Sequence, residues 1–231
     1  MKNYTEDEFE KKFNEILSQK IEDVKVVEKP KAFILGGQPG AGKSTIIDML
    51  SEKYSNIIVI SGDDFRKEHP RYRELAKIYK DDVVNETKDF ANNMTERLIE
   101  KLSDKKYNLI IEGTLRTAEV PIRTKNLLKQ KGYDVELNVM LVKPEISYAG
   151  TLERYEKMKD SGTIPRMTYK KYHDDVAADI IKNLDVLYKG KEFDNILLYN
   201  RNKECLYNQK ETQIKILECQ LNWDIEDLNF K

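Results

Sequence analysis

Residues 37–44 match the pattern G-x-x-x-x-G-K-[ST], which predicts a particular backbone shape and an element on either side of it. An apolar run at residues 32–35 comes directly before the pattern and predicts a buried parallel strand. Apolar residues at 46, 47, 49 and 50 follow it and predict a helix that begins near Gly42. A chance glycine-rich turn would not require a strand and a helix in register on its two sides.

The residue types in this stretch are those of a phosphate-binding loop. Glycine permits backbone angles at which successive N–H groups converge on one anion, and the N-terminus of the next helix adds positive potential. Lys43 would place a cation on the β- and γ-phosphates, and Ser44 would offer its hydroxyl oxygen to Mg²⁺. The sequence therefore predicts a nucleoside triphosphate site, which we assign to ATP with Mg²⁺ although the motif does not select the base. It is made by Gly37, Gln38, Pro39, Gly40, Ala41, Gly42, Lys43, Ser44 and Thr45.

Predicted strands and helices alternate along the rest of the chain. This order predicts an α/β fold with an open, mostly parallel sheet and helices on both faces, and ligands gathered beyond the carboxyl ends of the strands. We expect an N-terminal helix within residues 1–29, a P-loop kinase domain over 30–200 and a C-terminal helical extension over 201–231. Further strands are predicted at 57–60, 109–111, 135–142 and 195–199, and helices at 6–20, 81–102, 145–158, 168–188 and around 214–221.

A pair of carboxylates, Asp63 and Asp64, directly follows the second predicted strand. A kinase needs a carboxylate beside the γ-phosphate to accept the proton of the attacking hydroxyl, and we assign Asp63 that role. The alternative is that the two residues cap a helix starting at Phe65. Arg66 could bind an anionic substrate or lie on the surface, and His69 before Pro70 is expected to shape a turn.

A second polar group follows the third strand, where Glu112, Thr114 and Arg116 come in quick succession. Glu112 could reach Mg²⁺ through water or bind substrate hydroxyls, and we expect all three side chains to face a ligand. The alternative is a strand-end loop of ordinary polarity.

Two arginines, Arg154 and Arg166, lie on the predicted helix 145–158 and in the Gly/Pro-containing loop 159–166. P-loop kinases stabilise the transferring phosphoryl group with cations, and a mobile segment that carries arginine can close over the nucleotide. The alternative is that Arg154 pairs with a neighbouring carboxylate, either Glu153 or Glu156.

Composition excludes several other classes. The chain carries 40 Lys and Arg against 41 Asp and Glu, a net charge of −1, so it lacks the basic excess of a general nucleic-acid coat. Cys205 and Cys219 are not in a CxxC pair, so we expect a reducing cytoplasm rather than a metal site or disulfide framework. Residues 1–7 are too polar for a signal peptide, and no apolar run approaches the about 20 residues of a membrane span.

Together these stretches resemble the zeta toxin family of bacterial toxin–antitoxin systems. The resemblance covers about residues 30–180 and rests on the phosphate loop, on Gly-Asp-Asp-Phe-Arg with His-Pro at 62–70, on Ile-Glu-Gly-Thr-Leu-Arg-Thr at 111–117, on Gly-Thr-Leu-Glu-Arg-Tyr-Glu at 150–156 and on Pro-Arg at 165–166.

The resemblance implies a kinase that phosphorylates the sugar 3′-hydroxyl of UDP-N-acetylglucosamine, a UDP-amino sugar, and so starves cell-wall synthesis. It implies that Asp63 is the general base, that Lys43 binds ATP, and that Arg154 and Arg166 bind the phosphates. Substrate-binding positions would be Glu112, Thr114 and Arg116. A small helical antitoxin would obstruct the ATP site, and Phe9, Phe13 and Ile16 of the N-terminal helix could meet this partner.

Other functions stay open on the residues alone. A kinase for another small hydroxyl compound, such as an antibiotic or a nucleoside, would use the same chemistry. A nucleotide-dependent switch module would hydrolyse its nucleotide. At position 63 it would need a group that positions water, whereas a kinase needs a base that accepts the proton of a substrate hydroxyl. A polynucleotide kinase would want a basic track into the site, which the net charge disfavours.

Overall fold

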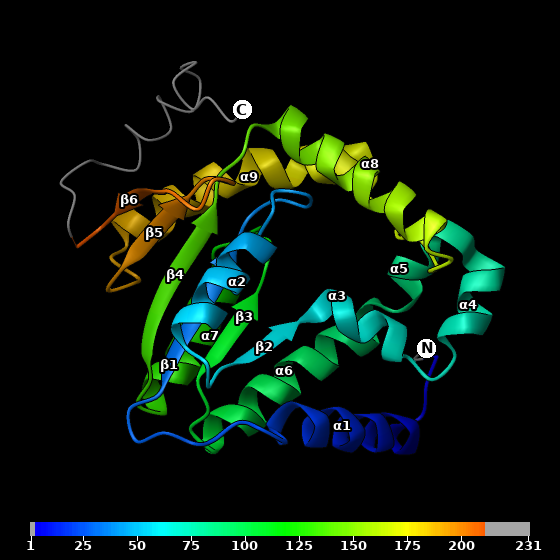
Figure 1. The fold of residues 1–231 in the computed structure, drawn as a ribbon, viewed down its shortest axis with the longest axis horizontal. Coiled ribbons are helices and arrows are strands. Elements are labelled where there is room, and N and C mark those ends of the chain that lie inside the picture. Colours follow the sequence, from blue (N-terminus) through cyan, green and yellow to red (C-terminus); the bar gives the residue numbers. More distant parts are fainter. Residues whose placement is uncertain (1–2, 211–231) are drawn as a thin grey trace.

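The computed structural model describes residues 3–210, which fold around a six-stranded sheet with the order β2–β3–β1–β4–β5–β6 (Figure 1). The first five strands run parallel, and β6 pairs antiparallel with β5 at the edge. The predicted open, mostly parallel sheet is confirmed. The strands are β1 Lys31–Gly36, β2 Ile58–Ser61, β3 Leu109–Glu112, β4 Asp134–Met140, β5 Ile196–Tyr199 and β6 Cys205–Asn208.

Helices connect the strands. The helix predicted over 81–102 is divided at Thr87, whose hydroxyl donates to Val83 O (2.8 Å) and so competes with the regular helical ladder. The α-helices are α1 Glu6–Ile21, α2 Ser44–Lys53, α3 Gly62–Phe65, α4 Tyr72–Tyr79, α5 Val83–Glu86, α6 Lys88–Asp104, α7 Glu119–Gln130, α8 Pro144–Asp160 and α9 Lys170–Lys189, with 3₁₀ turns η1 Arg66–Glu68 and η2 Lys80–Asp82.

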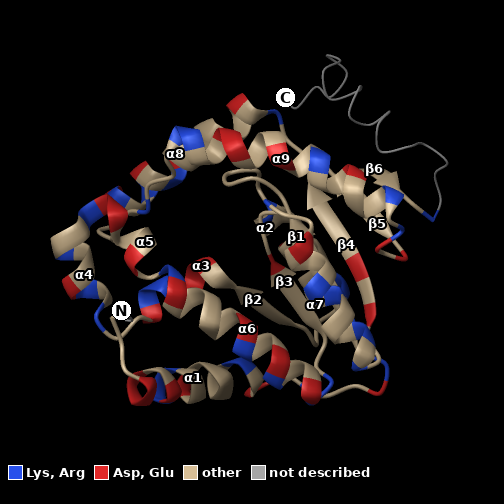
Figure 2. Cartoon of the chain, turned by 180° about the vertical axis from the view of Figure 1, so that it is seen from behind, with Lys and Arg blue, Asp and Glu red and all other residues tan. Residues whose placement is uncertain are grey.

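The sheet separates two apolar cores, as β1 shows by its alternation. Ala32 and Ile34 pack into a core shared with α1, α6, α7 and α9, whereas Phe33 and Leu35 pack against residues of α2 on the other face. Strand residues buried on both faces explain the continuous apolar runs in the sequence. Charged residues of both signs are spread over the outer helices (Figure 2).

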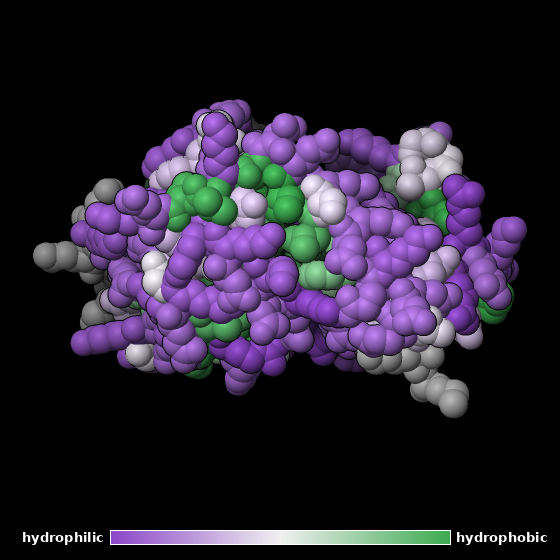
Figure 3. All heavy atoms as spheres, turned by 90° about the horizontal axis from the view of Figure 1, so that it is seen from below, coloured by the Kyte–Doolittle hydropathy of each residue, from purple (hydrophilic) through white to green (hydrophobic). Residues whose placement is uncertain are grey.

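Helix α1 is part of the larger core. A capping box of Thr5 and Glu8 starts it, as the sequence predicts. Phe9, Phe13 and Ile16 are 3–6% exposed and pack in the core with residues of α6. The prediction that these three side chains meet a partner is therefore wrong, because an amphipathic helix beside an apolar sheet buries its own stripe intramolecularly. The face of the molecule viewed from the α1 side is largely hydrophilic (Figure 3).

The segment after β5 differs from the prediction. A helical extension was expected from residue 201, but residues 201–204 form the turn into the short edge strand β6. The backbone of β6 completes the hydrogen bonding of β5, which a helix could not do. The amphipathic stretch around 214–221, with Cys219, lies outside the described residues. Across residues 3–210, no helix is both long and apolar enough to cross a membrane.

His69 shapes the turn between η1 and α4, in agreement with the expectation from sequence. Its ring is 3% exposed. Nδ1 accepts from the Arg71 N–H (3.1 Å), so Nε2 carries the proton and donates to Asn3 Oδ1 (2.9 Å). The Asn3 amide in turn donates to Glu86 O (2.8 Å), which ties the N-terminal segment to the end of α5.

Replacement of His69 by Ala is expected to lower the free energy of unfolding by about 1–3 kcal/mol, because it removes a buried ring and leaves two partly buried polar partners unsatisfied. Desolvation and the nearby Arg71 lower the pKa of His69 below its ordinary value of 6.5, and Glu8 opposes them only in part. The stabilisation is thus complete above pH 6.5 and is lost as the pH falls through the lowered pKa. Urea unfolding of both proteins near about pH 8 and about pH 5.5 checks this, and an equal difference at both values would contradict it.

Candidate active site

A pocket of about 500 Å³ lies beyond the carboxyl ends of β1, β2 and β3. Its walls come from the phosphate loop, from α3, from the start of α6, from the loop after β3, and from α8 with the segment that leads into α9. Segments far apart in the sequence therefore meet at the edge where open parallel sheets bind ligands. Six lining residues are basic and three are acidic: Lys43, Arg66, Lys88, Arg116, Arg154 and Arg166 against Asp63, Asp81 and Glu112.

The phosphate loop has the conformation that its glycines predict. Gly37, Gly40 and Gly42 have φ values of 148°, 76° and 97°, which residues with a side chain rarely adopt. Lys43 precedes α2 and is 9% exposed, and its Nζ donates to Gly37 O (2.9 Å). Of the nine predicted nucleotide-binding residues, Pro39 and Lys43 line the pocket itself.

The remaining residues of the phosphate loop support its backbone conformation from outside the pocket. Gln38 is fully buried, and its Nε2 donates to Val142 O (2.5 Å) just after β4. Ala41 is also buried. Ser44 is exposed as the first residue of α2, and the Thr45 N–H donates to Gly42 O (3.0 Å).

Asp63 lies in the short helix α3, directly after β2, and faces the pocket. Its Oδ1 accepts from Arg66 Nε (2.9 Å), and its Oδ2 lies 3.8 Å from Arg166. The helix begins at Gly62 and has no side-chain cap, so the alternative in which Asp63 and Asp64 cap a helix from Phe65 is wrong. Asp64 does not line the pocket.

The charge of Asp63 is set by three arginines. Desolvation in the pocket raises its pKa, but the positive charges of Arg166, Arg66 and Arg154 together outweigh that effect and hold the pKa below its ordinary value of 3.8. The side chain is therefore an ionised carboxylate at neutral pH. The Asp63 side chain lines the pocket and is 51% exposed. It is thus an available proton acceptor.

Arg66 belongs to the pocket and is not a surface residue. Besides its bond to Asp63, it donates to Val84 O (2.5 Å) at the start of the short helix α5, and 15% of its side chain is exposed. These contacts tie α3 to α5, so Arg66 fixes the orientation of Asp63 in addition to contributing positive charge.

Glu112 and the two residues predicted with it also line the pocket. Glu112 ends β3, and its Oε1 lies 3.6 Å from Lys43 Nζ, so this carboxylate is beside the phosphate loop. Thr114 follows in the connecting loop, and the guanidinium of Arg116 lies 5.3 Å from the ring centroid of Tyr172 in α9. All three side chains therefore lie at the pocket, where a ligand could reach them.

Arg154 and Arg166 come together above Asp63. Arg154 donates to Thr168 Oγ1 (3.2 Å), and Arg166 donates to Asp63 O (2.8 Å). The alternative pairings of Arg154 are wrong, because Glu153 pairs with Lys157 (2.7 Å) and Glu156 with Lys159 (3.7 Å).

Both arginines also carry a donor with no protein acceptor. Among the described residues, the Nε atoms of Arg154 and Arg166 are buried and lack a hydrogen-bond partner. A buried donor without an acceptor is costly, and an oxyanion in the pocket would satisfy it. Desolvation and Arg166 lower the pKa of Arg154, while Asp63 and Glu112 raise it.

Several lining residues were missed by sequence reasoning. Tyr169 and Tyr172 are 53% and 39% exposed on the pocket wall, and Lys88 stands at the start of α6. Tyr169 precedes α9 and Tyr172 lies outside its buried stripe, and an aromatic residue outside such a stripe is a signal that could have indicated a ligand-facing position. Nothing in the sequence marked Lys88 as a ligand-facing residue, because a lysine at a helix end is common on any surface.

Comparison with known proteins assigns this arrangement to a family. The family model described as zeta toxin matches residues 14–212. This chain belongs to the zeta toxin family. A Toxin zeta of Streptococcus pyogenes is 45% identical over 212 residues, which cover 91% of this chain and 74% of that protein.

A solved structure from the PezAT chromosomal toxin–antitoxin system of Streptococcus pneumoniae superposes with a TM-score of 0.87 at 38% identity, covering 96% of this zeta-family chain and 88% of that one. An adenylate kinase of Thermococcus kodakarensis is 31% identical over 109 residues, 45% of this chain and 46% of that enzyme. The chain thus belongs to a toxin family, and a little under half of it is similar in sequence to an adenylate kinase.

Proposed function

We propose that this chain is a cytoplasmic kinase that transfers the γ-phosphate of ATP to the sugar 3′-hydroxyl of UDP-N-acetylglucosamine and thereby blocks cell-wall synthesis. The observation that carries the proposal is that one pocket is lined by both the phosphate-loop Lys43 and the ionised carboxylate of Asp63. Phosphoryl transfer to an alcohol needs these two groups beside each other.

In the proposed reaction Asp63 accepts the proton of the attacking hydroxyl. The hydroxyl oxygen then forms a bond to the γ-phosphorus, and the bond from that phosphorus to the bridging oxygen breaks, so that ADP leaves with the electron pair. Lys43, Arg154 and Arg166 stabilise the negative charge on the phosphoryl oxygens, and the buried Nε–H groups of the two arginines are available to them.

The oxygen donors beside Lys43 fit a magnesium ion. Ser44 presents a hydroxyl and Glu112 a carboxylate, and Mg²⁺ in kinase sites is held by few protein oxygens together with substrate phosphates and water. Among residues 3–210, no group of three or more His, Cys, Asp or Glu is placed to hold a metal ion by itself, and such a site does not need one. An ion held there would supply positive charge that offsets the negative charge of the phosphate oxygens.

The acceptor side of the pocket suits a molecule that combines negative charge with polar and planar parts. Glu112 and Thr114 can bind hydroxyl or amide groups, Arg116 can bind phosphate, and Tyr169 and Tyr172 offer aromatic surfaces. A UDP-amino sugar has all of these features. The family assignment favours it over an antibiotic or a nucleoside.

The test offers γ-labelled ATP and Mg²⁺ to the protein together with UDP-N-acetylglucosamine, other UDP-sugars, nucleosides or aminoglycosides. Labelled UDP-N-acetylglucosamine, with the phosphate at the 3′-position by mass spectrometry and NMR, is the expected product. Transfer of the label to a nucleoside or an aminoglycoside would show that this compound, and not UDP-N-acetylglucosamine, is the acceptor. Hydrolysis of ATP without transfer to any compound would favour a nucleotide-dependent switch.

A second proposal concerns the partner. The PezAT structure comes from a toxin–antitoxin system, and we infer that this chain likewise binds a small helical antitoxin that obstructs its ATP site. Because Phe9, Phe13 and Ile16 are buried, the contact must use other residues. Competition between the antitoxin and ATP for the purified chain is the expected result, and simultaneous binding of both would contradict it.

A further inference from the structure

Arg201 joins the turn between β5 and β6 to the phosphate loop. Its Nε donates to Ala41 O (3.1 Å), and one terminal nitrogen, Nη2, donates to Gly40 O (2.5 Å) and reaches Ile146 O in α8 (3.5 Å). One guanidinium thus contacts the carbonyl oxygens of two segments. Arg201 does not line the pocket.

The carbonyl oxygens of a phosphate loop need such a partner. When the backbone N–H groups converge on an anion, the C=O groups point away from it. The carbonyl oxygens of residues 37, 38 and 42 accept from donors within the loop, whereas those of Gly40 and Ala41 accept from Arg201. An arginine side chain suits this position because its planar fork carries five donors and always keeps its charge. Hydrogen bonds from a charged donor are about twice as strong as neutral ones.

The surrounding glycines leave the space that this contact occupies. A Cβ on Gly40 would lie 2.0 Å from Ser147 O, so the backbone of α8 touches the loop directly. A Cβ on Gly150 would lie 2.7 Å from Gly40 O and 2.8 Å from Arg201 Nη2. Glycine inside a helix destabilises it by roughly 0.5–1 kcal/mol relative to alanine, and close packing here explains its presence in α8.

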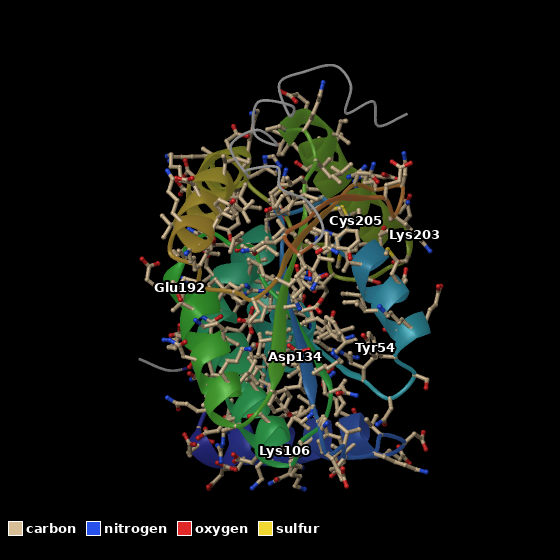
Figure 4. The ribbon with its side chains drawn as sticks, turned by 90° about the vertical axis from the view of Figure 1, so that its left-hand side faces the viewer. Tyr54, Lys106, Asp134, Glu192, Lys203 and Cys205 are labelled. Atoms are coloured by element: carbon tan, nitrogen blue, oxygen red, sulfur yellow. The ribbon has the colours of Figure 1, made fainter. Side chains whose placement is uncertain are left out.

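The turn that carries Arg201 is itself fixed. Asn200 is 5% exposed, and its Oδ1 accepts from the backbone N–H groups of Asn202 (2.9 Å) and Glu204 (3.1 Å). Figure 4 shows Lys203, near the tip of this turn, toward one end of the molecule, whereas Asp134, where β4 begins, and Lys106 lie toward the other. The turn therefore lies at the edge of the sheet where the phosphate loop is.

We propose that Arg201 is a positioning residue for phosphoryl transfer, which acts through the phosphate loop and α8 without touching the nucleotide. By holding Gly40, Ala41 and Ile146 together, it keeps Lys43 at the end of the loop and Arg154 on α8 directed at the same phosphates. This inference rests on the proposed function only in that the ligand of the loop is a nucleoside triphosphate.

The test compares the dissociation constants of Mg·ATP and of inorganic tripolyphosphate for the wild type and for Arg201→Met. If Arg201 acts through the loop, both ligands should bind about 10-fold or more weakly, and by the same factor, because both use the same backbone cradle. A loss for ATP alone would show that Arg201 contacts the nucleoside and would overturn the proposal, as would unchanged binding of both. Binding is measured without an acceptor, so a wrong acceptor in the proposed function does not affect the result.

Matched variants separate positioning from general damage. Arg201→Lys should give an intermediate loss, because one ammonium group lacks the fork, and full rescue by lysine would count against the proposal. Arg123→Met removes an exposed arginine of α7 whose partner is Glu96 (2.7 Å), and should bind both ligands like the wild type. Equal weakening in this control would show a non-specific charge effect and would refute the inference.

A second route covers the case in which Arg201→Met fails to fold. Gly150→Ala keeps Arg201 and raises helix propensity, yet its Cβ would meet Gly40 O and the guanidinium. We expect weaker binding of both ATP and tripolyphosphate with a circular dichroism spectrum like that of the wild type. Wild-type affinity for both ligands in this variant would overturn the claimed contact.

Discussion

Turnover by Asp63→Asn should fall by about 100-fold or more while ATP binding stays largely intact, which is the effect of losing a general base. Asparagine keeps the shape of the side chain and can still accept the hydrogen bond from Arg66 Nε (2.9 Å), so α3 should stay in place. It cannot accept the proton of the substrate hydroxyl. The loss should therefore appear in the chemical step.

Rapid-quench measurement of a single turnover with the identified acceptor checks this, together with the affinity for Mg·ATP. Asp64→Asn is the matched control, because Asp64 is adjacent and exposed but does not line the pocket, and its turnover should be near that of the wild type. Near-wild-type turnover of Asp63→Asn would refute the role of Asp63 as the base.

The same pair of variants has a cellular readout. If the chain acts as a toxin, Asp63→Asn should relieve growth arrest in a bacterial host and Asp64→Asn should not. Equal toxicity of Asp63→Asn and the wild type, at equal expression, would contradict a kinase mechanism for the toxicity.

Lys43→Ala is the second change expected to have a large effect, and it should weaken ATP binding and abolish detectable transfer. The lysine is 9% exposed and lies 3.6 Å from Glu112 Oε1, so its removal leaves a carboxylate without its counter-charge beside the phosphates. Loss of a charge-assisted bond of about 1.5–3 kcal/mol corresponds to roughly 10- to 150-fold weaker ATP binding, and repulsion by Glu112 adds to it.

Isothermal titration calorimetry with Mg·ATP measures this loss. Lys53→Ala, near the end of α2, is the control, because that exposed lysine does not line the pocket. The double variant Lys43→Ala/Glu112→Gln should recover part of the lost affinity, since it removes the repulsion. Failure of the double variant to recover any affinity would show that Glu112 does not face the phosphates.

Local patterns predicted most of the fold and the position of the phosphate-loop side of the pocket. The phosphate loop, β1 and α2 are adjacent in sequence, and glycine spacing and apolar runs determine them without distant contacts. Asp63 and Glu112 were predicted because a carboxylate that directly follows a buried strand must lie at one edge of the sheet.

Features that depend on distant segments were not predictable in the same way. Strand β6 has four residues, of which Tyr207 is the one that is buried, so it carries little periodicity and forms by pairing with β5. The contact of Arg201 with Gly40 joins residues 161 positions apart. The apolar stripe of Phe9, Phe13 and Ile16 correctly predicted a helix. It wrongly predicted contact with a partner protein, because an apolar stripe does not specify what covers it.

The surplus of basic side chains around the pocket has a practical consequence for biochemical work on this protein. Any small polyanion, including phosphate, sulfate, citrate or pyrophosphate from a buffer, becomes a competing occupant of the same cradle. Apparent affinities for nucleotide will therefore vary with the buffer anion at constant ionic strength, and melting curves recorded in phosphate will overstate the stability of the unliganded chain.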